Sequence, residues 1–78
     1  MQATPQSVSA ILRREGFTPV PTAREGLHVK RGALGAVTVI ADWDSPRKSR
    51  EQSDEAERVL SGRGFNLHRV SENIFRTE

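Results

Sequence analysis

The chain has 78 residues, enough for one domain but too few for two independent cores. It contains no cysteine and only two histidines, which excludes disulfides, zinc-finger spacings and thiol nucleophiles. Twelve Lys and Arg residues against ten Asp and Glu residues leave a net charge of only +2. Because no apolar run is long enough to span a membrane and the first residues lack the order of a signal peptide, we expect one cytoplasmic domain over residues 1–78.

The first predicted element is a short amphipathic helix. Thr4 is a suitable N-cap, and Pro5 occupies the first helical position, where its missing N–H costs nothing. Apolar residues then recur at helical spacing, namely Val8, Ile11 and Leu12. Gly16 suits the left-handed residue after a helix, and Phe17 can fold back on the last turn.

The next residues predict a hairpin. Residues 18–24 contain two prolines, which forbid a central strand, so we expect an extended edge or a connector there. Residues 27–31 alternate in polarity and residues 36–42 form a β-branched run, with a glycine-containing turn between them. These two segments are the expected strands.

A second helix is expected from a capping residue, Asp44 or Ser45, and a first-turn proline to about Gly62 or Gly64. Its first half is almost free of apolar residues, so we expect it to project beyond the sheet or to pack weakly through two serines. Only three residues of the helix form a core-facing patch, namely Ala56, Val59 and Leu60. Residues 66–70 and 74–76 predict a closing hairpin around a tight turn, with a single strand as the alternative.

The two halves of the chain are weakly similar. Ile11-Leu12 and Gly16-Phe17 recur 48 residues later as Val59-Leu60 and Gly64-Phe65. This pattern is typical of any helix that enters a strand through a glycine turn, and it also fits a repeated unit. Either way the predicted order is α-β-β-β-α-β-β. That order predicts an α+β fold of two layers, with two helices on one face of a small, mainly antiparallel sheet.

Two basic groups are candidate nucleic-acid contacts. One surrounds the first hairpin, and the other lies at the start of the second helix, where cations oppose the helix dipole and favour a bound anion. The groups are Arg24, His28, Lys30 and Arg31, and then Arg47, Lys48 and Arg50. Each has a plainer interpretation as well. His28 and Lys30 can lie on a solvated strand face, and Glu51 and Asp54 can neutralise the helical group.

Asp42, Trp43 and Asp44 are a third candidate. Carboxylates two apart on a strand point the same way and could hold a divalent metal, but capping of the second helix also explains Asp44. Trp43 either plugs the core or offers an exposed stacking surface. No nucleophile–base–acid set, glycine-rich nucleotide motif or phosphate loop is present. We therefore expect no catalytic residues, no metal and no cofactor.

Two resemblances accompany these patterns. Val8-x-x-Ile11-Leu12-Arg13-x-x-Gly16-Phe17 and Val37-x-Val39-x-x-Asp42-x-Asp44 resemble segments of small proteins encoded by actinobacteria and their phages. This resemblance implies a phage or mobile-element accessory protein, located in the host cytoplasm. Gly16-Phe17 and Gly26-Leu27-His28 resemble HicA-type toxins, which are small RNases with a double-stranded-RNA-binding fold. That resemblance implies a similar topology over residues 8–60 and a catalytic role for His28.

The sequence as a whole predicts a small, non-enzymatic binding module that contacts DNA or RNA through the two basic groups. One alternative is a protein-interaction module or inhibitor, including a homodimer, in which an amphipathic helix and Leu34 meet a protein surface. The other alternative is a HicA-like RNA-binding domain or RNase. None of the three involves a membrane.

Overall fold

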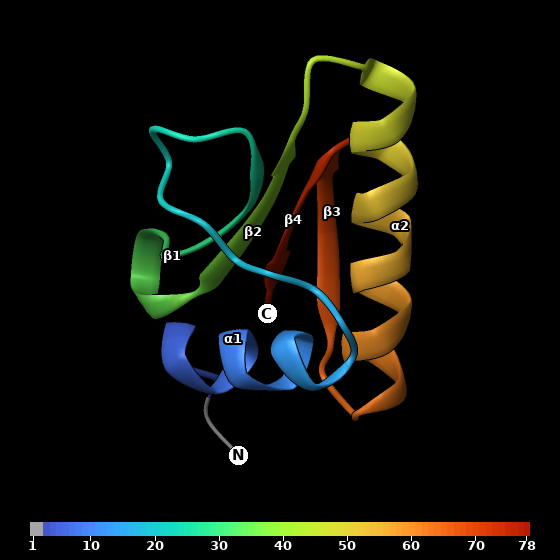
Figure 1. Cartoon of the computed structure of the whole chain (residues 1–78). Coiled ribbons are helices and arrows are strands. Elements are labelled where there is room, and N and C mark those ends of the chain that lie inside the picture. The colour runs from blue at the N-terminus through green and yellow to red at the C-terminus, as the bar shows by residue number, and fades with distance from the viewer. Residues whose placement is uncertain (1–2) are drawn as a thin grey trace.

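The computed structural model describes residues 3–78 and consists of two helical segments, a short 3₁₀ turn and four strands (Figure 1). In chain order these are α1 (Pro5–Arg14), β1 (Gly26–Arg31), η1 (Ala33–Gly35), β2 (Val37–Asp42), α2 (Pro46–Gly62), β3 (Leu67–Ser71) and β4 (Ile74–Thr77). The strands form one antiparallel sheet in the order β1-β2-β4-β3. The predicted α+β class, order of elements and two-layer arrangement are confirmed, with the first of the three strands expected between the helices present only as an isolated bridge.

The extended segment expected at residues 18–24 is reduced to a single bridge. Pro19 pairs with Leu27 in parallel, and the Val20 amide donates to the Leu27 carbonyl at 2.9 Å. The two prolines of this segment have no N–H to give to a ladder, so pairing cannot extend further. The segment therefore lies along the outer edge of β1.

Both helices begin with a polar cap followed by proline. Thr4 Oγ1 accepts from the Ser7 amide at 3.1 Å, and Ser7 Oγ accepts in return from the Thr4 amide at 3.0 Å. Ser45 Oγ accepts from the Lys48 amide at 3.2 Å, so Ser45 is the N-cap of α2. These hydrogen bonds satisfy backbone donors that have no partner within the helix.

Both helices also end in the same way. Gly16 and Gly64 have φ of +93°, a left-handed conformation that side chains with a Cβ avoid. The amide of the following phenylalanine then donates to a carbonyl in the last turn, Phe17 to Leu12 at 3.0 Å and Phe65 to Leu60 at 3.2 Å. The sequence similarity between the halves thus falls on equivalent helix ends, in two successive α-β-β units.

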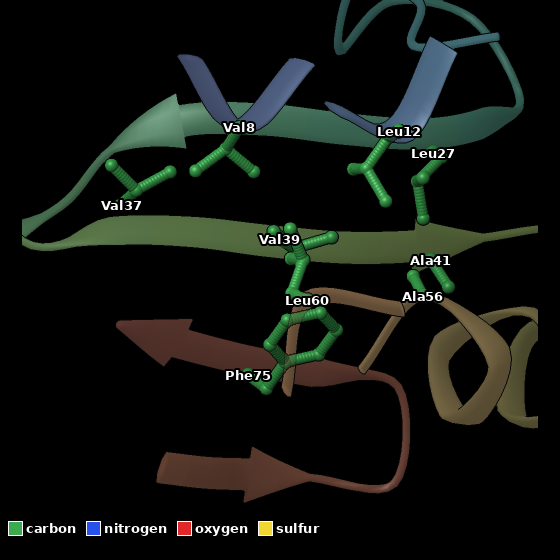
Figure 2. Close-up of a cluster of buried hydrophobic side chains, with 9 residues drawn as sticks. All are labelled: Val8, Leu12, Leu27, Val37, Val39, Ala41, Ala56, Leu60 and Phe75. Carbon is green, nitrogen blue, oxygen red and sulfur yellow. The ribbon is translucent and has the colours of Figure 1, made fainter. Parts of the chain in front are cut away.

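The core lies between the sheet and the helices (Figure 2). Phe75 of β4 is its largest fully buried side chain and pairs with Val39 of β2. The other buried apolar residues are Val8 and Leu12 of α1, Leu27 of β1, Val37 and Ala41 of β2, and Ala56 and Leu60 of α2. Because residues from both helices and three strands share this cluster, both helices pack on the same face of the sheet.

The first half of α2 is held by polar contacts. Ser49 Oγ accepts from the Trp43 amide at 2.8 Å and donates to the Trp43 carbonyl at 3.1 Å, which ties the helix to the end of β2. Ser53 is fully buried, and its hydroxyl accepts from the guanidinium of Arg69 on β3 at 2.6 Å. Neither α1 nor α2, the helices of the described residues, is long and apolar enough to cross a membrane.

Arg69 is the main link between α2 and β3. Its side chain is 29% exposed and forms ion pairs with Asp54, at 3.2 Å, and with Glu57. The guanidinium carbon also lies 5.5 Å from the centre of the Phe75 ring. One partly buried cation thus joins two carboxylates, a buried hydroxyl and the core.

Replacing this cation should destabilise the fold measurably. We expect Arg69→Met to lower the free energy of unfolding by about 1–3 kcal/mol, because the buried Ser53 hydroxyl and two adjacent carboxylates lose their partner. Urea denaturation measures this change. Arg58→Met is the matched control: the Arg58–Glu55 pair is exposed on both sides, so its loss should change stability by less than ~0.5 kcal/mol. Equal effects of the two substitutions would contradict the assignment.

Candidate nucleic-acid interface

The side of the sheet opposite α1 and α2 carries a set of polar and apolar side chains. Successive side chains of a strand point to opposite faces, so the residues between the buried ones point away from the helices. We call this side the open face. Its residues include His28 and Lys30 of β1, Thr38, Ile40 and Asp42 of β2, His68 of β3, and Ile74 and Arg76 of β4.

Four of these residues form a row across the whole sheet. Lys30 pairs with Thr38, Thr38 pairs with Arg76, and Arg76 pairs with His68. Lys30, Arg76 and His68 are exposed and Thr38 is half-buried. With neighbouring strands ~4.8 Å apart, the row is about 14 Å long. We call Lys30, Thr38, Arg76 and His68 the basic row.

The basic row contains no carboxylate. Among residues 3–78, the side chains paired with carboxylates are those of His28, Arg47, Arg58 and Arg69. Lys30 and Arg76 are not in that set, so within the described part of the chain their charges are not neutralised by an ion pair. The row can therefore offer two permanent positive charges to an anionic ligand.

His28 lies on the same side of the sheet but is only 3% exposed. Its Nδ1 is 3.0 Å from the Val20 carbonyl, and because a carbonyl can only accept, Nδ1 carries a proton. Its Nε2 is buried without a hydrogen-bond partner, 3.7 Å from a carboxylate oxygen of Asp42. The imidazole thus fastens the segment before β1 to the sheet. In this conformation neither the predicted nucleic-acid contact nor the catalytic role implied by the HicA resemblance is accessible to it.

The remaining residues of the first predicted group lie at the two ends of β1. Arg24 is exposed in the turn before β1, where its amide donates to the Pro21 carbonyl at 2.9 Å. Arg31 pairs with Val37, whose side chain is buried in the core, so Arg31 projects on the helical side of the sheet. Of this group only Lys30 belongs to the basic row.

The second predicted group lies on the helical layer. Arg47 forms an exposed ion pair with Glu51 at 3.1 Å, and Lys48 Nζ lies 5.5 Å from the centre of the Trp43 ring. Arg50 is exposed on the same turn of α2. Because α2 packs on the face opposite the basic row, the structure does not place these three cations on the same face as Lys30.

The Asp42-Trp43-Asp44 segment serves the junction between β2 and α2. Trp43 is half-buried and packs against the core, beside a groove of about 650 Å³ between the end of α1 and α2. The Asp44 amide donates to Glu25 at 2.6 Å. No group of three or more metal-ligating side chains occurs within residues 3–78, so the two carboxylates do not belong to such a cluster.

The sequence did not single out Arg76 and His68. In a strand, Phe75 and Arg76 point to opposite faces, so a buried Phe75 places Arg76 on the solvent side. This much the sequence alone indicates. The neighbour of Arg76 on β2 is Thr38, almost forty residues away, and nothing local specifies that pairing. The row is visible only once the sheet is assembled.

The role of His28 can be tested through the segment that it fastens. We expect His28→Ala to lower the free energy of unfolding by about 1–3 kcal/mol, because the hydrogen bond to the Val20 carbonyl is lost. Hydrogen exchange should show weaker protection of the Val20 amide, which donates to Leu27. His28→Asn, whose side-chain amide can occupy the place of Nδ1–H, should restore much of that protection. Unchanged protection in His28→Ala would refute the role.

The comparisons with known proteins identify no relative. No protein-family model matches the chain, and no curated protein or solved structure is significantly similar to it. Function is therefore inferred from the geometry of the candidate site. Its most regular feature is the basic row, whose four side chains come from paired positions on neighbouring strands.

Proposed function

We propose that the protein is a small, non-enzymatic nucleic-acid-binding module that binds phosphates with its basic row. The observation that carries the proposal is the unbroken pairing of Lys30, Thr38, Arg76 and His68 across four strands. A rigid antiparallel sheet fixes the spacing of these side chains. It therefore presents them to a ligand at a smaller entropic cost than a flexible loop would.

The chemistry of the row suits a phosphate backbone. Lysine, arginine and threonine side chains all donate hydrogen bonds to phosphate oxygens, and arginine can do so in a bidentate manner. The base pairs of a duplex rise by ~3.4 Å along its axis. A row of about 14 Å that lies along this axis therefore spans about four base-pair steps. The two permanent cations can then contact different phosphates at the same time.

The row offers no phenylalanine, tyrosine or tryptophan ring for base stacking. Phe75 points into the core, and the other aromatic residues, Phe17, Trp43 and Phe65, lie at the ends of helices or strands outside the row. Single-strand binders usually combine basic grooves with exposed aromatic platforms. We therefore expect contact with the phosphate backbone, little preference for sequence, and binding to a duplex at least as strong as binding to a single strand.

The salt dependence of binding tests the proposal. We expect fluorescence polarisation with a labelled duplex to show affinity that falls steeply with salt, since each phosphate contact contributes about −0.9 to the slope of log K against log salt. Lys30→Gln and Arg76→Gln should each weaken binding and reduce the steepness of that slope by about 1, because each removes one phosphate contact.

Arg47→Gln is the matched control, since it removes the same charge from the helical layer, where Arg47 is already paired with Glu51. It should leave the slope nearly unchanged. The proposal fails if the duplex does not bind at low salt, or if Arg47→Gln reduces the slope as much as Arg76→Gln does.

A further inference from the structure

The turn between β1 and β2 presents a leucine in an unfavourable conformation. Leu34 has φ 58° and ψ 26°, the left-handed region that glycine and asparagine tolerate and that a leucine Cβ disfavours. Its side chain is also fully exposed, with 106% relative accessibility. A strained backbone and an exposed apolar side chain are two separate costs. Hydrogen bonds across the turn, from the Gly32 amide to the Ala36 carbonyl and from the Ala36 amide to the Ala33 carbonyl, hold the backbone, but they leave the side chain exposed. Such a combination points to a contact outside the chain.

A hollow lies directly beside this side chain. Its volume is about 540 Å³, and Leu34 itself forms part of its wall. The rest of the wall is mixed. It combines small residues and one aromatic ring with four polar residues, namely Ala3, Ala33, Gly35, Ala36, Gly64 and Phe65, and then Asn66, Arg76, Thr77 and Glu78. Since an apolar cavity of ~150 Å³ already holds a benzene-sized group, this hollow can take a leucine side chain. Residues of η1, of the connection from α2 to β3 and of the C-terminal end of the chain meet around this hollow.

The projection and the hollow share one surface patch, and this arrangement is self-complementary. In a pair of copies related by a half-turn, each Leu34 can face the other copy's hollow, which is the geometry of an isologous contact. The charged residues of the patch can also complement each other across the half-turn. Arg76 and Glu78 both line the hollow, and the Glu78 amide is held by the Asn66 carbonyl at 3.0 Å. The half-turn can set Arg76 of one copy against Glu78 of the other.

We propose that a second copy of this chain docks on this patch, with Leu34 as the reciprocal anchor. A large apolar side chain seated in a pocket at the centre of a contact is the usual anchor of an interface. One patch contains the projecting Leu34, the hollow that would receive it and side chains of both charges. This combination is self-complementary, as a symmetric dimer interface requires. Arg76 belongs both to this patch and to the basic row, whereas Leu34 lies outside the row, so the two proposals are tested separately through Leu34.

Sedimentation velocity from micromolar to millimolar protein tests the proposal. The wild-type mass should rise from 8.7 kDa toward twice that value. Leu34→Asn removes the apolar anchor and suits the left-handed backbone. This variant should therefore remain monomeric over the whole range, while its melting temperature, measured at a concentration where the wild type is monomeric, rises. A loss of association combined with higher stability cannot be attributed to unfolding.

Two further variants complete the test. Glu78→Arg should weaken association several-fold, because like charges then face each other across the two-fold axis. Val70→Thr alters the other exposed large apolar side chain, on β3, and should leave association unchanged. The proposal is overturned if the wild type stays monomeric at millimolar concentration, or if Leu34→Asn associates as tightly as the wild type. Duplex affinity of Leu34→Asn at monomeric concentrations should equal that of the wild type, so failure of one proposal leaves the other testable.

Discussion

The pairing of β2 with β4 joins the two α-β-β halves of the chain into one sheet. Three residue pairs make this junction, Thr38 with Arg76, Val39 with Phe75, and Ile40 with Ile74. The middle pair points inward and brings the largest core side chain against β2, whereas the first pair points outward and connects the cations of the two halves. The buried core and the basic row thus depend on the same short ladder. A shift of one residue would expose Phe75 and bury Arg76.

Local signals explain why much of the fold could be predicted from the sequence. The caps at Thr4 and Ser45 and the left-handed glycines at Gly16 and Gly64 involve residues within one helical turn, and each was recognisable in the sequence. The alternation of the strands likewise gave the first hairpin. The register between β2 and β4 joins residues far apart in sequence, and no local pattern specifies it. The fold class could therefore be predicted, but the basic row could not.

The charges that cluster in sequence are not the ones that form the basic row. The basic run at the start of α2 was the most unusual feature of the sequence, yet Arg47 pairs with Glu51, and Lys48 lies over Trp43 on the helical layer. Lys30 and Arg76 are isolated from each other in sequence and share one face of the sheet. His28 was predicted to contact nucleic acid, and the HicA resemblance implied a catalytic role for it. Its ring is instead buried and holds the segment before β1 against the sheet.

The most direct test of the account is to map by NMR the backbone and side-chain resonances that shift when a short duplex is added to the labelled protein. We predict that the largest changes fall on Lys30, Thr38, His68 and Arg76, with little change on α2. Changes concentrated on residues 47–50, or absent from the open face while the duplex is bound, would contradict the assignment of the basic row as the binding surface.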